Sequence, residues 1–346
     1  MNMTVTTEKV ILNKDRNVSL MVMRQSIGGE FGFDKRPAVV ILPGGAYAMC
    51  SDREAEVVAY PYLTAGFHAF VLRYSVAEHK AWPNPLNDWE QAMEYILAHA
   101  EKWGVSENRI AVIGFSAGGH LAACAATMAQ HRPNAAILGY AALTKEVASM
   151  CQPGTYIPSP IDHVDGKTPP CFLMAARDDT IVPMQNPNLF MQALDAKGIT
   201  YECHIYPYGG HGFSTAEPHL ADNVCPRTPN WVRESIGFLE DIFGELTPRG
   251  FKKPRCLGKV NGDSEEFLSV NCTYGYLKKQ ANAQAVIGTI VAAVDAIISA
   301  AYPNSDKAQA VFGTFFFRDI LSFVKKNEEE CNAVDDALRA LKNEGV

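Results

Sequence analysis

The sequence predicts an α/β protein with a mostly parallel central sheet, helices on both faces, and an all-helical extension at the C-terminus. Two observations support this fold class. From residue 1 to about 245, short β-branched runs alternate with helical stretches, and the runs are almost continuously apolar. Residues 267–346 carry no strand signal and show helical patterns, which indicates a separate helical region. The 346 residues are enough for more than one domain.

The predicted elements follow one another in a regular order. The first two segments, 4–12 and 18–23, predict an antiparallel hairpin at one edge of the sheet. Further strands are predicted at residues 39–42, 70–74, 110–113, 135–138, 171–176 and 201–206. Helical patterns between and after them lie near residues 53–64, 86–102, 117–130, 186–198 and 229–243. This alternation is typical of parallel strands that are covered on both faces.

The chain divides into three predicted parts: a first domain at 1–246, a linker at 247–266, and a helical domain of unknown role at 267–346. The linker is basic and rich in proline and glycine. Residues 285–302 are long and apolar, but Asp295 interrupts them and alanine predominates. We therefore favour a buried helix of a small bundle over a membrane span.

Composition and charge narrow the class of partner. Hydrophobic residues make up 47% of the chain and charged residues 20%, as in soluble globular proteins. The formal net charge of −7 argues against nucleic acid or an anionic membrane as a partner. The nine cysteines are scattered without a C-x-x-C pair, which argues against a disulfide framework or a metal site. Because the N-terminus also lacks a signal-peptide pattern, we expect a cytoplasmic location.

A serine flanked by glycines lies at a predicted junction between a strand and a helix. The segment Gly114-Phe115-Ser116-Ala117-Gly118 fits the pattern G-x-S-x-G. This pattern predicts a sharp turn that exposes the serine Oγ and leaves no room for a Cβ atom two residues to either side. The N-terminus of the next helix would favour negative charge beside the serine. The alternative is a tight turn whose serine only caps the helix.

A nucleophilic serine needs a base and an orienting carboxylate, and both residue types follow later strands. His211 lies in a glycine-rich segment just after the predicted strand 201–206. Asp178 and Asp179 follow the predicted strand 171–176, and the pattern leaves both open as the acid. A pair of aspartates that caps a helix is the alternative.

The loop after strand 39–42 predicts the rest of an oxyanion site. Gly44 and Gly45 would let the backbone approach a substrate closely. We expect the donors to be the N–H group of Ala117 and that of Gly45 or Ala46. A simple glycine turn that ends a strand is the alternative.

Several residues on strand-end loops are candidates for substrate binding. The favoured ones are Gly44, Tyr47, Trp82 and Phe213, and Cys50, Tyr140 and Tyr156 have a similar setting. Aromatic side chains there could stack on a sugar or an aryl group, and simple packing is the alternative.

Six segments together resemble the α/β-hydrolase superfamily, and more narrowly its bacterial esterase/lipase branch with acetylxylan-esterase-like and carbohydrate-ester deacetylases. They are 42–47, 51–56, 66–76, 109–123, 168–186 and 206–214. The resemblance spans about residues 8–244 and implies an α/β-hydrolase catalytic domain that needs no cofactor. It implies Ser116 as nucleophile, His211 as base and Asp179 as acid in preference to Asp178, since Asp179 lies four residues before Pro183.

The predicted function is that of a serine carboxylesterase for short-chain, acetyl-type esters of sugars or oligosaccharides, acting through an acyl-enzyme. A prolyl-oligopeptidase-like peptidase or a thioesterase is the alternative among enzymes, and a non-catalytic binding scaffold is the alternative outside catalysis. The expected ligand is a small-molecule ester, without nucleic acid, membrane or metal. The C-terminal helices predict either a homodimer contact or a cap over the site.

Overall fold

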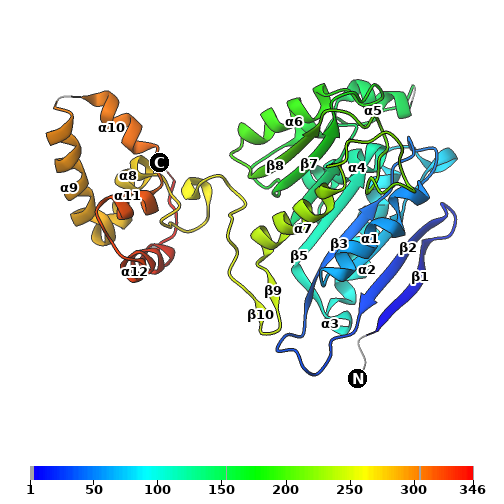
Figure 1. Ribbon diagram of the computed structural model, residues 1–346, viewed down its shortest axis with the longest axis horizontal. Coiled ribbons are helices and arrows are strands. Elements are labelled where there is room, and N and C mark those ends of the chain that lie inside the picture. The colour runs from blue at the N-terminus through cyan, green and yellow to red at the C-terminus, as the bar shows by residue number, and fades with distance from the viewer. Residues whose placement is uncertain (1–3, 153, 304, 346) are drawn as a thin grey trace. The chain divides into compact units, whose positions relative to one another are not determined.

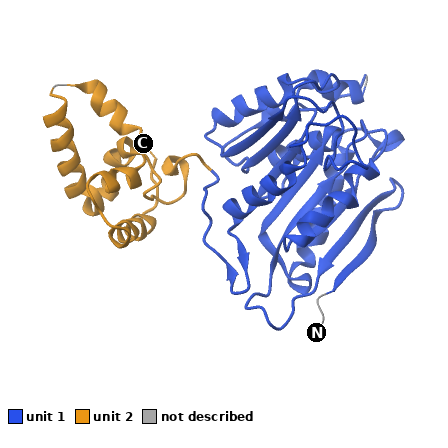
Figure 2. Ribbon diagram, in the orientation of Figure 1, with its two compact units in different colours: residues 1–258 blue, residues 259–346 orange. Residues whose placement is uncertain are grey.

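The computed structural model describes residues 4–152, 154–303 and 305–345. The chain forms two compact units, unit 1 (Met1–Gly258) and unit 2 (Lys259–Val346), coloured separately in Figure 2. The division falls inside the segment 247–266 that the sequence predicts as a linker. Among the described residues, the buried core clusters of the two units share no member.

Unit 1 is built on an eight-stranded sheet with the strand order β1-β2-β4-β3-β5-β6-β7-β8 (Figure 1). The strands are β1 (Val5–Asn13), β2 (Val18–Gln25), β3 (Arg36–Leu42), β4 (His68–Arg73), β5 (Val105–Phe115), β6 (Ala135–Gly139), β7 (Cys171–Ala176) and β8 (Tyr201–Tyr206). The pairs β1/β2 and β2/β4 are antiparallel, and the remaining neighbours are parallel. The predicted fold class and the predicted edge hairpin are therefore confirmed.

Helices cover both faces of this sheet. They are α1 (Glu56–Thr64), α2 (Asn84–Ala98), α3 (Ala100–Trp103), α4 (Ser116–Met128), α5 (Lys145–Cys151), α6 (Gln185–Asp195) and α7 (Asn230–Phe243). Alternate residues of β3 enter different cores, because successive strand side chains point to opposite faces. Val40 and Leu42 pack with residues of α2, α4 and α6, whereas Val39 and Ile41 pack with residues of α1 and α7. Because both the odd-numbered and the even-numbered residues of the strand are buried, the strand is apolar without interruption in the sequence.

Helix α4 lies close against the sheet and carries the serine at its first position. All of residues 117–127 are buried, and most of them are small. Small side chains let the helix axis approach the sheet, and they explain why an alanine-rich segment follows the serine. Because α4 follows β5 near the middle of the strand order, Ser116 lies at the edge of the sheet where the parallel strands end.

Unit 2 is helical, as predicted for the C-terminal region. Its helices are α8 (Tyr274–Lys279), α9 (Gln284–Ala301), α10 (Asp306–Gly313), α11 (Phe317–Phe323) and α12 (Glu328–Arg339). A short hairpin of β9 (Leu246–Thr247) and β10 (Gly250–Phe251) precedes the unit, within the predicted linker. Asn327 and Glu330 form a reciprocal capping box at the start of α12, which fixes where that helix begins.

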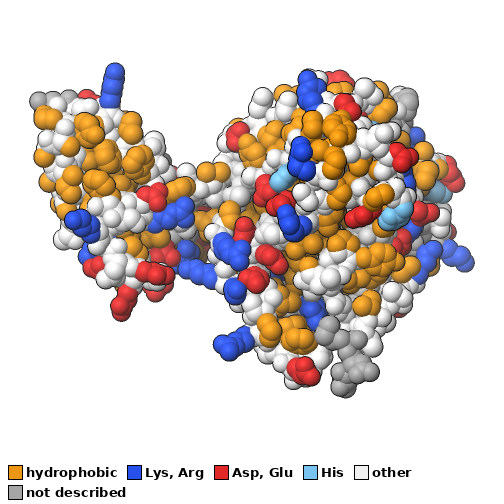
Figure 3. All heavy atoms as spheres, in the orientation of Figure 1, with side chains coloured by type: hydrophobic (Ala, Val, Ile, Leu, Met, Phe, Trp, Pro, Cys, Tyr) orange, Lys and Arg blue, Asp and Glu red, His pale blue; other side chains and the backbone are white. Residues whose placement is uncertain are grey.

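Helix α9 departs from the prediction that the apolar segment 285–302 is buried. Only Ile287, Val294 and Ile298 are buried, so the helix buries one stripe rather than its whole surface. Apolar side chains gather over the part of unit 2 that carries α9 and α10 (Figure 3). The stretch Ala281–Ala301 has the length and composition of a membrane span, but this is weak evidence because core helices of soluble proteins meet the same criteria.

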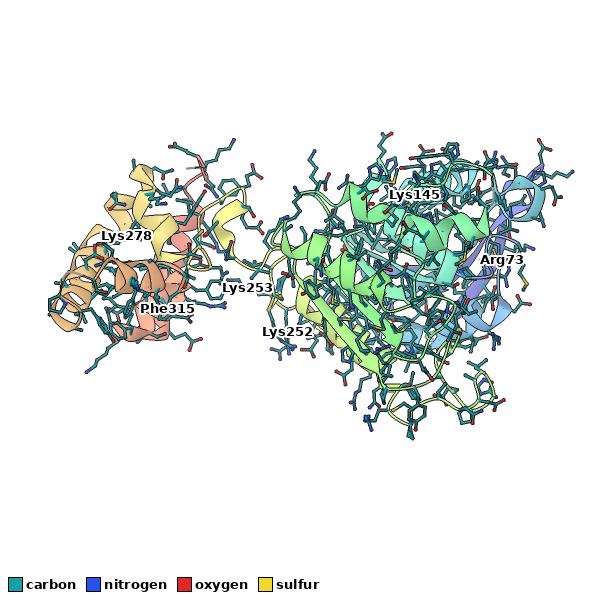
Figure 4. All side chains as sticks on the ribbon, turned by 90° about the horizontal axis from the view of Figure 1, so that it is seen from above. Arg73, Lys145, Lys252, Lys253, Lys278 and Phe315 are labelled. Atoms are coloured by element: carbon teal, nitrogen blue, oxygen red, sulfur yellow. The ribbon has the colours of Figure 1, made fainter. Side chains whose placement is uncertain are left out.

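The charge within α9 is paired inside unit 2. Asp295 accepts a hydrogen bond of 2.7 Å from the Tyr274 hydroxyl and one of 2.9 Å from Lys278 Nζ. Lys278, labelled in Figure 4, extends from α8. This pairing explains how a carboxylate is accommodated in the middle of an apolar helix.

Candidate active site

Three side chains that the sequence singled out meet where the parallel strands end. Ser116 follows β5, Asp179 follows β7, and His211 follows β8. Ser116 Oγ lies 2.9 Å from His211 Nε2, and His211 Nδ1 lies 2.7 Å from Asp179 Oδ2. The fold thus joins residues that are 95 and 32 positions apart in the chain into one chain of hydrogen bonds.

The surroundings of Asp179 define the direction of these hydrogen bonds. Its side chain is fully buried, and Oδ1 accepts bonds of 2.9 Å from the backbone N–H groups of Ile181 and Val182. A carboxylate accepts hydrogen bonds, so His211 Nδ1–H donates to Oδ2. His211 Nε2 is then the acceptor for the Ser116 hydroxyl, which is the arrangement that a general base requires.

Asp178 has a different contact. Its side chain is on the exposed side of the loop, and Oδ1 accepts a bond of 2.9 Å from the backbone N–H of Gly210. The structure therefore places Asp179, not Asp178, against the His211 ring, and Asp178 against the backbone next to it.

The turn at Ser116 has the tight geometry that the pattern predicts. Ser116 has a backbone φ of +51°, in the left-handed region that non-glycine residues rarely adopt. A Cβ atom on Gly118 would collide with the carbonyl oxygens of Leu42 and Pro43, and one on Gly114 would collide with Gly118 O. The two glycines therefore let α4 pack directly against β5 and the end of β3.

Two of the predicted oxyanion donors, Gly45 and Ala46, lie in the loop after β3, which has unusual backbone geometry. Gly45 and Ala46 have φ values of +127° and +54°. In the part of the chain that the structure describes, neither of their N–H groups donates a hydrogen bond. Ala117 is the second residue of α4, where helical N–H groups lack an acceptor in a preceding turn. The Gly44 N–H differs, because it donates to Glu54 Oε2 at 2.8 Å. Successive free N–H groups of this kind form a concave site that favours an anion.

The predicted substrate-binding residues fall into two groups. Tyr47 and Phe213 are 0% and 1% exposed, so their rings pack inside the fold and offer no surface to a substrate, contrary to the prediction. Gly44 is also buried, and Trp82 is half-buried with its ring 5.9 Å from that of His120. Packing, the alternative in the sequence analysis, accounts for the two buried rings.

His120 organises the buried side of the site. Its Nε2 lies 2.9 Å from the carbonyl oxygen of Pro158 and its Nδ1 lies 2.7 Å from the Tyr47 hydroxyl. A carbonyl only accepts, so Nε2 carries the proton and Nδ1 accepts from Tyr47. Complete burial lowers the pKa of His120 to about 4, which keeps the ring neutral.

Glu54 is the residue near the site that the sequence analysis missed. It is 4% exposed, and its carboxylate contacts the Gly44 N–H and the Tyr140 hydroxyl. Nothing in the segment 51–56 distinguishes it from the neighbouring acidic residues Asp52 and Glu56, because all the residues of the segment except Ala55 are polar. Only the tertiary contacts identify it.

The described residues, 4–152, 154–303 and 305–345, contain no cluster of three or more His, Cys, Asp or Glu residues that could hold a metal ion. All nine cysteines are free of disulfide bonds in the structure.

Comparisons with known proteins agree with this fold. Residues 32–152 match the protein family described as BD-FAE. An α/β-hydrolase enzyme from a Medee basin deep-sea metagenome library has a similar crystal structure, with a TM-score of 0.64 and 38% identity over 68% of this chain and 97% of that one. The chain belongs to the α/β-hydrolase family.

Two further relatives carry more specific names. The acetylxylan esterase of Xylanibacter ruminicola is 27% identical over 72% of this chain and 54% of its own length. The crystal structure of an acetyl ester-xyloside bifunctional hydrolase from Caldicellulosiruptor lactoaceticus has a TM-score of 0.61 and 27% identity, over 68% of this chain and 96% of that one. Both names are typical of the esterase-like branch of the family.

The curated relatives are longer than the part this chain matches. The chain spans 33% of endo-1,4-beta-xylanase B of Butyrivibrio fibrisolvens, to which it is 30% identical over 53% of its own length, and 54% of the acetylxylan esterase. The structural relatives, in contrast, are covered almost completely, and they match about two thirds of this chain.

Proposed function

We propose that this chain is a serine carboxylesterase that hydrolyses short-chain, acetyl-type esters of sugars or oligosaccharides. The observation that carries the proposal is the chain of hydrogen bonds from Ser116 through His211 to Asp179, at the edge where the parallel strands end. Nucleophile, base and orienting carboxylate in contact are the requirement for acyl transfer by a serine.

In this proposal, Ser116 Oγ attacks the ester carbonyl carbon while His211 Nε2 takes the hydroxyl proton. The negative charge that develops on the carbonyl oxygen is stabilised by the N–H groups of Ala117 and of Gly45 or Ala46. The intermediate collapses, the bond to the alcohol oxygen breaks, and His211 returns the proton to the leaving alcohol. Water then attacks the acyl-enzyme by the same steps and releases the acid.

The choice of substrate is supported by the names of the relatives. One is called an acetylxylan esterase and another an acetyl ester-xyloside hydrolase, so acetyl groups on xylose-based sugars are the first substrates to test. In its described part, the segment between β6 and β7 holds the seven-residue helix α5 and a short 3-10 helix, Pro160–His163. Helices this short favour short acyl groups over long lipid chains, which need a wide apolar surface.

The proposal is tested with p-nitrophenyl acetate, butyrate and octanoate, and with acetylated xylo-oligosaccharides. We expect kcat/KM to fall as the acyl chain lengthens, and acetate to be released from the oligosaccharides. Ser116→Ala should lower turnover by roughly 10⁴ to 10⁶, because the serine, histidine and aspartate act as a unit. Retention of more than about a tenth of the activity in Ser116→Ala would contradict the assignment.

A matched serine substitution controls for changes in the fold. Ser106 is 5% exposed and donates to Asn108 within β5, at the far end of the strand from Ser116. Ser106→Ala should leave hydrolysis unchanged. Equal loss in both variants would mean that the effect of Ser116→Ala is on stability and not on chemistry.

A further inference from the structure

We infer that Glu54 is a positioning residue that, through Tyr140, fixes the oxyanion loop and the histidine loop relative to each other. The oxyanion loop is residues 43–51, and the histidine loop is residues 207–216. The inference rests on the proposed function, because it assigns a role within the same site.

The carboxylate of Glu54 joins two parts of the molecule that are distant in sequence. Oε2 accepts a hydrogen bond of 2.8 Å from the backbone N–H of Gly44, and Oε1 accepts one of 2.6 Å from the Tyr140 hydroxyl. Gly44 directly precedes Gly45, whose N–H is a proposed oxyanion donor. Fixing Gly44 therefore fixes the start of the peptide that presents this donor.

Tyr140 extends the connection to the histidine loop. Its hydroxyl accepts a bond of 3.0 Å from the backbone N–H of Ser214, three residues after His211, and its ring meets the His211 ring edge to face at 5.1 Å. Burial raises the pKa of Tyr140 well above its usual value, and the nearby Glu54 carboxylate adds to the shift. The hydroxyl thus keeps its proton, which it donates to Glu54 while it accepts from Ser214.

The segment that carries Glu54 is itself held from both sides. Arg73, labelled in Figure 4, binds Glu56 Oε1 at 2.6 Å and Asp52 Oδ1 at 2.9 Å, one acidic residue on each side of Glu54. The Ser214 hydroxyl donates to the carbonyl oxygen of Arg53. These contacts hold the backbone segment on both sides of the Glu54 carboxylate.

The position of these contacts indicates a role beyond stability. Both loops present groups to the same reacting centre, and displacement by as little as about 1 Å can cost on the order of 100-fold in rate. Burying a carboxylate is costly unless hydrogen bonds compensate for the lost water, and here two donors do so. Those two donors come from the two parts of the site that the carboxylate connects. Tyr140 also has a φ of +34°, an uncommon conformation for a residue with a side chain, which the surrounding contacts must support.

Tyr140→Phe and Glu54→Gln test this inference. The first removes the bridging hydroxyl, and the second leaves one of the two donors without an acceptor, because an amide has one oxygen. We expect kcat for p-nitrophenyl acetate to fall roughly 10- to 100-fold, with KM changed less than about twofold. The rate at which a fluorophosphonate labels Ser116 should fall in parallel.

Tyr62→Phe is the matched control, because it also removes a buried tyrosine hydroxyl from the same core cluster. Tyr62 is 0% exposed and bonds Ser235 Oγ at 2.7 Å, which joins α1 to α7 and not the two loops of the site. Tyr62→Phe and Tyr140→Phe should lower the unfolding temperature by similar amounts, whereas only Tyr140→Phe should lower kcat. Equal kcat in these two variants would overturn the inference.

The double variant Glu54→Gln/Tyr140→Phe tests whether the two residues act through one connection. The loss in kcat should then be clearly smaller than the product of the two single losses. Independent, multiplicative losses would contradict the connection. Wild-type protein that neither hydrolyses p-nitrophenyl acetate nor reacts with the fluorophosphonate would instead refute the proposed function, and the inference with it.

Discussion

At the scale of single residues, Asp178 and Asp179 are neighbours with different contacts. The buried side chain of Asp179 accepts from His211 Nδ1, whereas exposed Asp178 accepts from the backbone N–H of Gly210. Asp179→Asn should lower kcat by roughly 10³ to 10⁴, because an amide nitrogen facing Nδ1 favours the wrong histidine tautomer.

Asp178→Asn is the internal control, since its amide oxygen can still accept from Gly210. We expect this variant to lose less than about tenfold in kcat, measured on the same ester. If the ranking were reversed, the role of the acid would pass to Asp178.

Sequence reasoning reached some of these residues and not others, for physical reasons. Ser116 and His211 could be located because each lies in a glycine-rich segment just after a predicted strand, in the chain order that a nucleophile and its base require. The position after a strand fits Asp178 and Asp179 equally, and only the family resemblance, through the distance to Pro183, favours Asp179. Tyr47 and Phe213 were expected at the substrate because an aromatic residue on a loop has the same local pattern whether its ring packs inward or faces solvent.

At the scale of elements, the approach of α4 to the sheet depends on Gly118. A Cβ atom there would collide with two backbone carbonyl groups, which cannot move aside as a flexible side chain would. Gly118→Ala should lower the free energy of unfolding by roughly 1 to 3 kcal/mol or more, as overpacking of a tight contact does. Denaturant unfolding and the hydrolysis rate should both report the change.

Gly237→Ala is the opposite case. Gly237 lies inside helix α7, and a Cβ atom there would meet nothing within 4 Å. Because alanine favours the helix, this variant should be more stable by roughly 0.5 to 1 kcal/mol. A Gly118→Ala protein as stable as wild type would show that α4 does not pack as described.

The boundaries of elements were harder to predict than their existence. Strand β5 begins at Val105, whereas the sequence predicts its start near residue 110. The early start could not be predicted because residues 106–109 are polar and give no strand signal. The helix predicted at 86–102 is interrupted at His99, which separates α2 from α3. In both places, tertiary packing overrides the local pattern.

At the scale of the whole molecule, two buried histidines predict sensitivity to acid. Burial lowers the pKa of His68 and of His120 to about 4, from an ordinary value of 6.5. Above pH 6.5 both are neutral whether the chain is folded or unfolded, so they add no pH dependence. Between pH 6.5 and 4 the unfolded chain binds protons that the folded protein excludes, so stability falls by up to about 3 kcal/mol for each histidine.

Urea unfolding at a series of pH values from 8 to 4.5 measures this effect. The free energy of unfolding should be level above pH 6.5 with respect to these groups and decline below it, and His120→Gln should make the decline less steep. An unchanged slope in His120→Gln would contradict the assignment of a neutral, buried His120.

The C-terminal part of the chain shows where sequence analysis was weakest. Its helical character was predicted correctly, but α9 buries one stripe of its surface and not the whole helix. Composition alone does not show which apolar residues of a helix pack against another element. The proposed homodimer through these helices and the cytoplasmic location stay predictions. Units 1 and 2 each have their own core, which is consistent with separate roles.

The most direct test of the central claim is to map where a fluorophosphonate reacts, using intact mass and peptide mass spectrometry on the full chain. The account predicts one adduct per chain, located on Ser116, and none in Ser116→Ala, with much slower labelling in His211→Ala because the base is missing. No adduct on the wild-type protein, or an adduct on another residue, would contradict the claim that Ser116 is an activated nucleophile.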